Sequence, residues 1–336
     1  VRLVPGDSRG AAMQYFTGSK AHNIALRDRA IGLGLKLNEY GVFRVDDDTR
    51  VAGATEEDVY AALGLAWPPP ELRENRGEIE AAAVGPLPAL IERAHLRGDL
   101  HMHTTATDGK DTIEGMVEAA AAAGLEYIAI TDHSQALAMA NGLDETRALQ
   151  HAARIRAVDG HAGVRVLAGI ECDIRADGTL DLADECLAAL DLVIVSVHSA
   201  FNLDRTQMTD RLIRAIANPH VDIVGHPSGR LLLRREPLPF DMEAVIEAAA
   251  RHGVAMEINC QVDRLDLNDV HARLARDRGV PLVISTDAHS TGGFGRLRWG
   301  ALVARRAWLQ PEHVLNTRSF EAFTAGLGFH FIQETL

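Results

Sequence analysis

Histidine and acidic residues recur at the ends of short apolar runs after residue 98. An H-x-H pair opens the series, and because alternate side chains of a strand point to the same face, His101 and His103 can reach one ion. Zinc, manganese and iron accept mixed imidazole and carboxylate ligands. The nine candidate ligands are His101, His103, Asp108, His133, Glu171, His198, His226, Asp287 and His289. These residue types at these places predict a metal centre.

The size of this set indicates more than one ion. Nine side chains exceed the roughly four to six ligands that one ion holds, so two or three ions with a bridging carboxylate are expected. Clustered metal ions polarise phosphoryl oxygens, generate hydroxide near neutral pH and stabilise a leaving oxygen, so phosphoester hydrolysis is the leading chemistry. Any one of these histidines alone is more often a hydrogen-bonded structural residue, so the prediction depends on all the positions together.

The apolar runs that carry these residues predict seven strands. They are residues 99–101, 127–131, 164–170, 192–197, 221–225, 254–259 and 282–285. Helical stretches lie between most of them, at residues 112–123, 145–159, 205–217, 242–251 and 268–278. Strands joined by crossover helices predict a parallel sheet. Because polar residues end nearly every strand, we favour a barrel related to the TIM type over an open doubly wound sheet, whose ligands gather at one switch point.

The length of 336 residues suggests a small domain followed by the barrel. Residues 1–66 predict a mixed α/β unit. Its expected elements are a strand-like stretch Val1–Val4, a Gly/Ser-rich turn, a helix at 22–33, a hairpin of residues 40–45 and 49–51, and a helix beginning at Thr55. Proline and glycine in residues 67–96 indicate a linker with a helical piece, so the boundary is expected near residue 96.

The composition is that of a globular chain, with 47% hydrophobic and 24% charged residues. No run reaches the roughly 18 apolar residues of a membrane span, and the start lacks a signal-peptide pattern. Three cysteines without CxxC spacing argue against a disulfide scaffold. We therefore expect a cytoplasmic protein with no membrane partner. The formal charge is −13, but residues 1–44 hold seven basic and three acidic residues, which allows a local nucleic-acid-binding surface.

The motif order HxH…D, TDH, E, H, GHP and DAH, from residue 98 to about residue 310, resembles the PHP family, named for polymerase and histidinol phosphatase. The resemblance implies an α/β fold, a distorted seven-stranded (β/α)7 barrel that binds a trinuclear metal cluster. By this resemblance, the first ion is held by His101, His103, Glu171 and Asp287, the second by Glu171, His198 and His226, and the third by Asp108, His133 and His289. Manganese is the favoured ion, with zinc or iron as alternatives.

Motifs in the first part of the chain are Tyr15-Phe16-Thr17-Gly18-Ser19, His22-Asn23, Arg27 and Asn38-Glu39-Tyr40-Gly41. They resemble the end of the palm and the thumb of family X DNA polymerases. In that family the aromatic pair and the glycine turn line the nucleotide pocket, the asparagine meets the minor-groove side of the base, and the arginine contacts the template. The resemblance thus assigns nucleotide or DNA binding to Tyr15, Phe16, Gly18, Asn23 and Arg27. Alternatively, these residues only pack the small domain.

A thumb followed by a PHP barrel is the arrangement of bacterial and archaeal family X polymerases. We therefore expect a palm end and thumb-like α+β domain at residues 1–75, a linker at 76–96 and a PHP metallo-phosphoesterase domain at 97–336. The resemblance implies a 3′–5′ exonuclease that acts on DNA ends, with the palm and fingers of the full-length polymerase as partners. The three palm aspartates of the family are absent from this sequence, so we expect no polymerase activity from it.

Two basic residues near the ligands are candidates for contacts with a phosphate. Lys110 follows Asp108, and Arg230 follows the GHP motif; either cation would offset developing negative charge. Asn259 ends the strand that lacks a ligand and is expected to face the same mouth. The alternatives are a small-metabolite phosphomonoesterase of the histidinol phosphatase type and a DNA-binding module with an inactive barrel. An amidohydrolase-type barrel also begins with His-x-His, but it has eight strands and ends in a lone aspartate.

Overall fold

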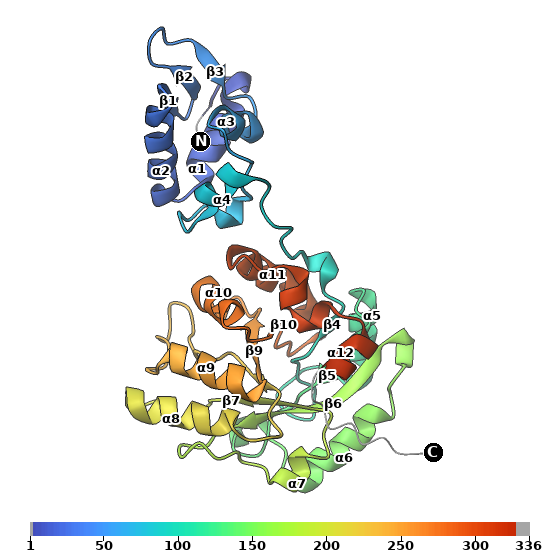
Figure 1. Ribbon diagram of the computed structural model, residues 1–336. Coiled ribbons are helices and arrows are strands. Elements are labelled where there is room, and N and C mark those ends of the chain that lie inside the picture. Colours follow the sequence, from blue (N-terminus) through green and yellow to red (C-terminus); the bar gives the residue numbers. More distant parts are fainter. Residues whose placement is uncertain (1–2, 327–336) are drawn as a thin grey trace. The chain divides into compact units, whose positions relative to one another are not determined.

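Figure 1 shows the computed structural model, which describes residues 3–326 of the chain. Contacts divide the chain into two compact units between Ala89 and Leu90. Each unit has a hydrophobic core of its own. Within the described range, none of the helices combines the length and apolar character that a membrane crossing requires.

The first unit is a small α+β domain. Its elements are α1 (Arg9–Thr17), α2 (Lys20–Gly32), β1 (Leu35–Asn38), β2 (Gly41–Arg44), β3 (Arg50–Ala52), α3 (Glu56–Ala62) and α4 (Glu78–Val84). The three strands form an antiparallel sheet in chain order. Leu26 of α2, Val42 of β2 and Val59 of α3 meet in its core. The two predicted helices correspond to α2 and α3, and the predicted hairpin corresponds to β2 and β3.

Three segments of the first unit differ from the sequence prediction. Helix α1 occupies part of the segment where a turn was expected. It packs so closely on the start of α3 that a Cβ at Gly10 would lie only 2.0 Å from the carbonyl carbon of Thr55, so this position requires glycine. The described part of Val1–Val4 forms no strand. Helix α4 lies in the expected linker, and its Ile79 packs into the core of the first unit.

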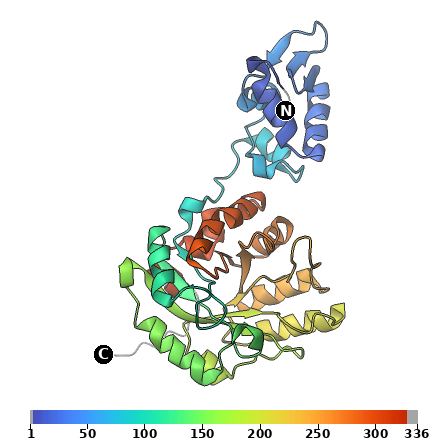
Figure 2. The ribbon, with the colours of Figure 1, turned by 180° about the vertical axis from the view of Figure 1, so that it is seen from behind.

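The second unit is a seven-stranded α/β barrel, which confirms the predicted fold class. Its strands are β4 (Gly98–Asp99), β5 (Tyr127–Ile130), β6 (Arg165–Asp173), β7 (Leu192–Ser196), β8 (Ile223–Val224), β9 (Ala255–Asn259) and β10 (Leu282–Ser285). All neighbouring strands are parallel and follow chain order. Its helices are α5 (Ile113–Ala122), α6 (Glu145–Arg156), α7 (Asp184–Leu187), α8 (Arg205–Ile216), α9 (Met242–His252), α10 (Asp269–Asp277), α11 (Leu297–Arg306) and α12 (Phe320–Gly326). Figures 1 and 2 show helices arranged around the outside of the sheet.

The two edge strands, β4 and β10, are joined by polar bridges. Asn316 donates from Nδ2 to the carbonyl oxygens of Gly98 and Ile284, both at 2.7 Å. The buried Asp99 carboxylate accepts hydrogen bonds from the main-chain N–H and the hydroxyl of Thr286, at 3.0 and 2.6 Å. These bridges nearly close the barrel and bring the residues after β4 next to the residues after β10.

The barrel interior changes from apolar to polar along the strands. Inward side chains near the strand starts form one hydrophobic cluster that contains Leu167, Leu192, Ile194, Ile223, Ala255 and Val283. On four of these strands the inward side chain nearer the mouth is polar and buried. These residues are Glu171, Ser196, Glu257 and Ser285. Because side chains alternate along a strand with a period of two, these strands place an apolar residue at the floor and a polar residue at the mouth.

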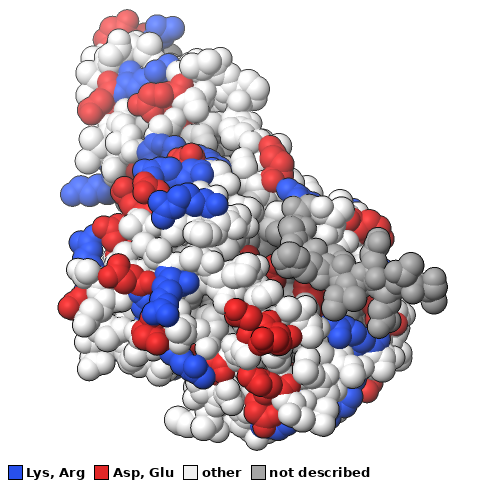
Figure 3. All heavy atoms as spheres, turned by 60° about the horizontal axis from the view of Figure 1, so that its bottom comes forward, with Lys and Arg blue, Asp and Glu red and all other residues white. Residues whose placement is uncertain are grey.

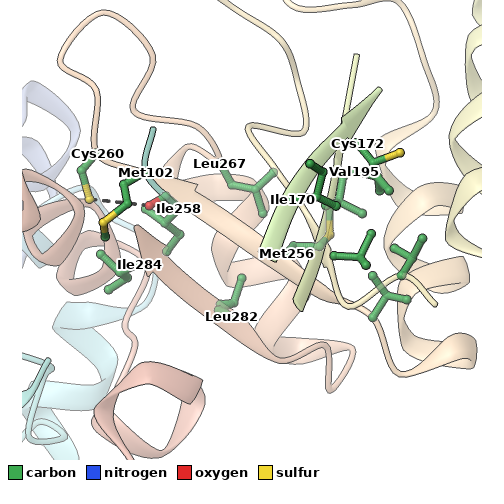
Figure 4. Close-up of a cluster of buried hydrophobic side chains, with 14 of the residues drawn as sticks. Met102, Ile170, Cys172, Val195, Met256, Ile258, Cys260, Leu267, Leu282 and Ile284 are labelled. Carbon is green, nitrogen blue, oxygen red and sulfur yellow. Dashed lines mark hydrogen bonds between the residues drawn. The ribbon is translucent and has the colours of Figure 1, made fainter. Parts of the chain in front are cut away.

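The outward side chains of the same strands form the main hydrophobic layer under the helices. Figure 4 shows part of it, with Ile170 and Cys172 of β6 and Met256 and Ile258 of β9. Ile170 and Cys172 alternate with Glu171 along β6, and Met256 and Ile258 alternate with Glu257 along β9, so each strand has one apolar outer face and one polar inner face at the mouth. The strands are therefore buried on both faces, as is typical of a parallel sheet covered by helices.

Asp222, just before β8, is expected to make the stability of the second unit depend on pH. Burial raises the pKa of its carboxyl to about 7, although the carboxyl accepts a hydrogen bond from the N–H of Val193 at 2.8 Å. A carboxyl with a raised folded-state pKa destabilises the fold as the pH rises from its ordinary pKa of 3.8 to about 7. Asp222→Asn keeps an acceptor, so we expect Tm to rise by about 2–4 °C near pH 8 and to change little near pH 4. Calorimetry at both pH values checks this, and equal shifts would contradict it.

Candidate metal centre

All nine predicted ligands converge on the mouth of the barrel. His101 and His103 follow β4, Asp108 lies in the next loop, His133 follows β5, Glu171 lies in β6, His198 follows β7, His226 follows β8, and Asp287 and His289 follow β10. Their ligand atoms form four overlapping groups, with the atoms of each group within 4.8 Å of one another. The groups are His103–Asp108–His133–His289, His101–His103–Glu171, His101–His226–Asp287 and His133–Glu171–His198.

Glu171 occupies the centre of this arrangement. Its side chain is 1% exposed. Its carboxylate oxygens lie 3.4 Å from His101, 3.6 Å from His103, 2.9 Å from His133, 3.4 Å from His198 and 2.8 Å from His226. One oxygen, Oε1, faces the last two imidazoles, and Oε2 faces the other three. This division suits a carboxylate that bridges two ions.

Two backbone features allow the ligands to approach one another. Asp287 has a φ of +52°, a left-handed conformation that is rare for residues other than glycine and that clusters at functional sites. In this conformation its Oδ1 lies 3.2 Å from Nε2 of His103. Before His226, a Cβ at Gly225 would come within 2.6 Å of the Ser196 hydroxyl, so the close strand approach at this point requires glycine.

The mouth is most open at Asp108 and His289. Their side chains are 36% and 34% exposed, whereas His103 is fully buried. Burial raises the pKa of the Asp108 carboxyl, but contacts with His133 and His289 outweigh it and hold the pKa well below its ordinary value. Lys110 lies on this side: its side chain is exposed, and its main-chain N–H donates to the carbonyl oxygen of His289 at 2.9 Å. A substrate can therefore approach the ligand set from here.

Two buried carboxylates that the sequence pattern did not indicate hold the ligand imidazoles. Glu257 lies 2.8 Å from Nδ1 of His101, and its other oxygen accepts the main-chain N–H of His226 at 2.6 Å. Asp173 lies 2.6 Å from Nδ1 of His198. Such contacts place the Nδ1 proton toward the carboxylate and leave Nε2 free to bind an ion. Both Glu257 and Asp173 stand at positions whose side chains point into the barrel, and this alternation along the strand could have predicted them.

Asp132 fastens the loop that carries Asp108. It accepts hydrogen bonds from the main-chain N–H and hydroxyl of Thr104, at 2.8 and 2.7 Å, and from the hydroxyl of Thr107. Its second oxygen also lies 2.7 Å from Nε2 of His151 in α6. Burial raises the pKa of Asp132, but the contact with His151 and nearby imidazoles lower it overall. The ionised carboxylate is therefore a fixed anchor for this loop.

The ligand histidines differ in their affinity for protons. Burial lowers the pKa of His103 to about 4 and that of His226 to about 3. Burial also opposes protonation of His133 and His198, but the negative charge of Glu171 outweighs it and raises their pKa values to about 10 and 9. Protons and metal ions therefore compete for the imidazoles that surround Glu171.

The donor atoms at the mouth fit metal ions better than a closed hydrogen-bond network. Nε2 of His101, both ring nitrogens of His103, Nδ1 of His133 and Oε2 of Glu171 are buried and make no hydrogen bond of regular geometry among the described residues, although Nδ1 of His133 lies 2.9 Å from Oε2 of Glu171. Each unsatisfied buried polar group costs about 1–3 kcal/mol, so their concentration at one place indicates a ligand. Imidazole and carboxylate donors suit divalent manganese, iron and zinc.

Comparison with known proteins gives the family. Residues 99–261 match the PHP domain, and residues 12–74 match the DNA polymerase beta thumb. A probable phosphatase of Edwardsiella ictaluri is 33% identical over 228 residues, which cover 65% of this chain and 89% of that protein. The chain belongs to the PHP family. Its barrel is a PHP domain, the domain of metal-dependent phosphoesterases.

This chain is also similar to a DNA polymerase. The DNA polymerase/3′–5′ exonuclease PolX of Bacillus subtilis is 42% identical over 327 residues, or 97% of this chain, and this chain spans 57% of the length of that relative. These matches confirm both family resemblances. The crystal structure of histidinol phosphate phosphatase from Lactococcus lactis, with zinc, L-histidinol and phosphate, has a TM-score of 0.46 and 17% identity, and the match covers 62% of this chain and 93% of that one.

Arg264, which the sequence pattern did not indicate, reaches the ligand set of the PHP domain. Its Nε lies 3.7 Å from Oδ2 of Asp287, and one terminal nitrogen is buried without a hydrogen-bond partner among the described residues. The guanidinium of the predicted Arg230 donates to the main-chain carbonyl oxygens of Arg264 and Leu265, and its contact with a phosphate stays a prediction. These contacts make it a support for the loop of Arg264. Asn259 does face the mouth, where its Nδ2 donates to Asp287 at 3.1 Å.

The five predicted nucleotide-binding residues of the thumb-like unit lie in α1, α2 and the turn between them. Asn23 is 8% exposed and donates to the carbonyl oxygen of Tyr15 at 2.7 Å, and a Cβ at Gly18 would press on its amide at 3.0 Å. These contacts pack the unit. Phe16 is 59% exposed, and Arg27 lies 5.8 Å from the centre of the Tyr15 ring. Phe16 and Arg27 are both exposed, and their role in nucleotide or DNA binding stays a prediction.

We expect Glu257→Gln to weaken metal binding. The amide removes the charge that holds the Nδ1 proton of His101, and loss of such a contact typically costs about 10–100-fold in metal affinity or activity. Manganese titration by calorimetry measures the effect, with Glu243→Gln, an exposed glutamate of α9, as control. Unchanged affinity in Glu257→Gln would show that this carboxylate does not tune the site.

Proposed function

We propose that this chain is a metal-dependent 3′–5′ exonuclease that acts on DNA ends in repair or proofreading. The observation that supports the proposal is the occurrence of a full set of nine converging ligand residues and a polymerase-type thumb in one chain. The name of the Bacillus subtilis relative combines the same two activities, polymerase and 3′–5′ exonuclease. An enzyme that hydrolyses a small metabolite does not need a polymerase-type thumb domain.

The nine residues would hold a trinuclear cluster, with Mn²⁺ as the proposed ion and Zn²⁺ or Fe²⁺ as alternatives. When bound, such ions polarise the phosphoryl oxygens and activate water near neutral pH. The protein's own part is to orient the donors. Glu257 and Asp173 hold the Nδ1 protons of His101 and His198, and Asp132 fixes the loop of Asp108.

Arg264 is the proposed phosphate-binding residue, and Lys110 is a second candidate on the exposed side. A guanidinium near the cluster can donate two hydrogen bonds to non-bridging phosphate oxygens. We expect Arg264→Ala to lower kcat/KM for DNA by about 10–100-fold, because charge-assisted hydrogen bonds contribute about 1.5–3 kcal/mol each. Metal content should not change, and Arg264→Lys should recover part of the activity. A parallel loss of metal and activity would instead assign Arg264 to support of Asp287.

The proposed partner of the barrel is a single-stranded or primer–template DNA 3′ end. The palm and fingers of a longer polymerase are the proposed partners of the thumb-like unit. Figure 3 shows lysine and arginine interspersed with aspartate and glutamate on the face in view. This face therefore offers no extended basic footprint for a DNA backbone.

A gel assay tests the proposal. Single-stranded and primer–template DNA labelled at the 5′ end is incubated with manganese, magnesium, zinc or EDTA, beside the Asp287→Ala variant. The expected result is a ladder that shortens from the 3′ end, requires metal and is lost in the variant. The absence of such a ladder from metal-loaded protein would overturn the proposal.

A small-molecule phosphomonoesterase is the second candidate. Several relatives with the name probable phosphatase favour this candidate. They are 30–33% identical to this chain, and the matches cover 89–97% of their length. Hydrolysis of small phosphomonoesters without cleavage of DNA would establish this alternative. DNA binding without hydrolysis of either substrate would identify a binding module.

A further inference from the structure

A short hairpin projects from the segment after His226. Leu231 and Arg235 pair through two main-chain hydrogen bonds of 2.9 and 2.8 Å. The three residues between them, Leu232, Leu233 and Arg234, form what we call the leucine tip. The Leu233 side chain is fully exposed and Leu232 is 37% exposed.

The hairpin is fixed at its base. The main-chain N–H groups of Ser228 and Gly229 both donate to the buried carboxylate of Asp266, at 2.9 and 3.0 Å. The N–H of Leu232 donates to the carbonyl oxygen of Asp263 at 2.6 Å. This bond ties the leucine tip to the loop of residues 261–266, which also carries Arg264. The tip is therefore fixed to the loop whose Arg264 lies 3.7 Å from the candidate ligand Asp287.

The side chains of the leucine tip contribute little to the fold. Leu233 has a φ of +62°, which is unfavourable for a branched side chain and natural for glycine or asparagine. A fully exposed leucine buries no apolar area that would offset this strain. Val262, on the paired loop, is also exposed, at 56%. An exposed apolar group at a strained position next to a reaction site suggests a contact with a ligand.

The positive charges around the tip suit a nucleic acid. Arg230 donates to main-chain carbonyl oxygens, and Arg235 donates to the carbonyl oxygen of Gly229 at 2.9 Å. Because neutral carbonyls leave a guanidinium its full charge, these arginines retain attraction for phosphates. Arg234 is 72% exposed and forms an ion pair of 3.8 Å with Asp263, which is 40% exposed, so solvent screens this pair and leaves Arg234 accessible to a phosphate. In a chain of net charge −13, this local arginine density complements a polyanion.

We propose that the leucine tip packs against unpaired nucleobases of the DNA strand whose 3′ end enters the metal centre, while the adjacent arginines bind its phosphates. This inference rests on the proposed exonuclease function and adds a contact, the one between the leucine tip and the bases of the strand. Apolar side chains at such tips pack on or insert between bases because every base offers an apolar face. A fully paired end must fray before it can make this contact.

The test replaces the tip and measures DNA and a small substrate in parallel. The variant is Leu232→Ser with Leu233→Gly, since glycine relieves the strain at φ +62° and should fold well. Leu149→Ser, at an exposed leucine of α6, is the matched control. The three proteins are assayed on a 5′-labelled single-stranded oligonucleotide and on bis(p-nitrophenyl) phosphate, a diester without nucleobases. Binding of a fluorescent single-stranded oligonucleotide without hydrolysis is measured by anisotropy in EDTA.

We expect the tip variant to lose about 10-fold in kcat/KM on the oligonucleotide, mainly through KM, and a similar factor in DNA affinity. Hydrolysis of the small diester should match that of wild type. Equal losses on both substrates, or unchanged DNA affinity and cleavage, would overturn the proposal. If wild type binds DNA but does not cut it, the exonuclease function fails, and the change in affinity still decides whether the tip contacts DNA.

Discussion

Glu171→Gln is expected to lower phosphoester hydrolysis by at least about 10³-fold, equivalent to about 4 kcal/mol of transition-state stabilisation. The reason is geometric. Both oxygens of Glu171 face ligand imidazoles, and five histidines lie within 3.6 Å of them. An amide has one oxygen acceptor and no negative charge, so it cannot bridge two ions. It also removes the charge that balances the surrounding imidazoles.

Measurements of bound metal and of secondary structure distinguish the loss of metal from unfolding of the Glu171→Gln variant. Mass spectrometry of the purified variant should find less bound metal than in wild type, while circular dichroism should show the same secondary structure. Glu118→Gln, at an exposed glutamate of α5, provides the matched control. Activity and metal content near wild type in Glu171→Gln would remove the bridging role from this residue.

The convergence of the nine candidate ligands could be predicted because their positions follow strand geometry. Most of the candidate ligands follow a strand, and parallel strands place their carboxyl ends at one edge of the sheet, so the sequence pattern was enough to predict that residues such as His101 and Asp287 come together. Glu257 has the same parity but was overlooked, because a lone glutamate inside an apolar strand carries no motif. Only the distance of 2.8 Å to His101 shows that it belongs to the site.

Residues outside the strands were harder to predict. Arg230 and Arg264 both lie in loops after strands, and no periodicity fixes which way a loop side chain points. In the structure Arg230 turns to main-chain carbonyls, whereas Arg264 reaches Asp287. The thumb-like unit shows the same limit. Helix α1 forms where glycine and serine suggested a turn, because close packing against Thr55 overrides local propensity.

Removal of metal by EDTA is expected to lower the Tm of the second unit, by an amount that grows with pH. Ligand at about 100 times its Kd stabilises a fold by about 2.7 kcal/mol, which corresponds to about 5–10 °C for a unit of this size. The pH dependence comes from His133 and His198. In the metal-free site Glu171 holds their pKa values at about 10 and 9, above the ordinary value of 6.5.

The sign follows from these raised values. Protonation of His133 and His198 stabilises the metal-free fold fully below about pH 6.5, and this contribution is lost as the pH rises through about 9 to 10. Metal ions need the neutral imidazoles, so protons weaken their binding at low pH. The Tm difference between manganese-loaded and EDTA-treated protein should therefore increase between about pH 6.5 and pH 9, as followed by calorimetry. The first unit contains none of the nine ligands, so its transition serves as an internal control. A difference that shrinks with rising pH, or that appears equally in both units, would contradict a metal centre built on Glu171 and its histidines.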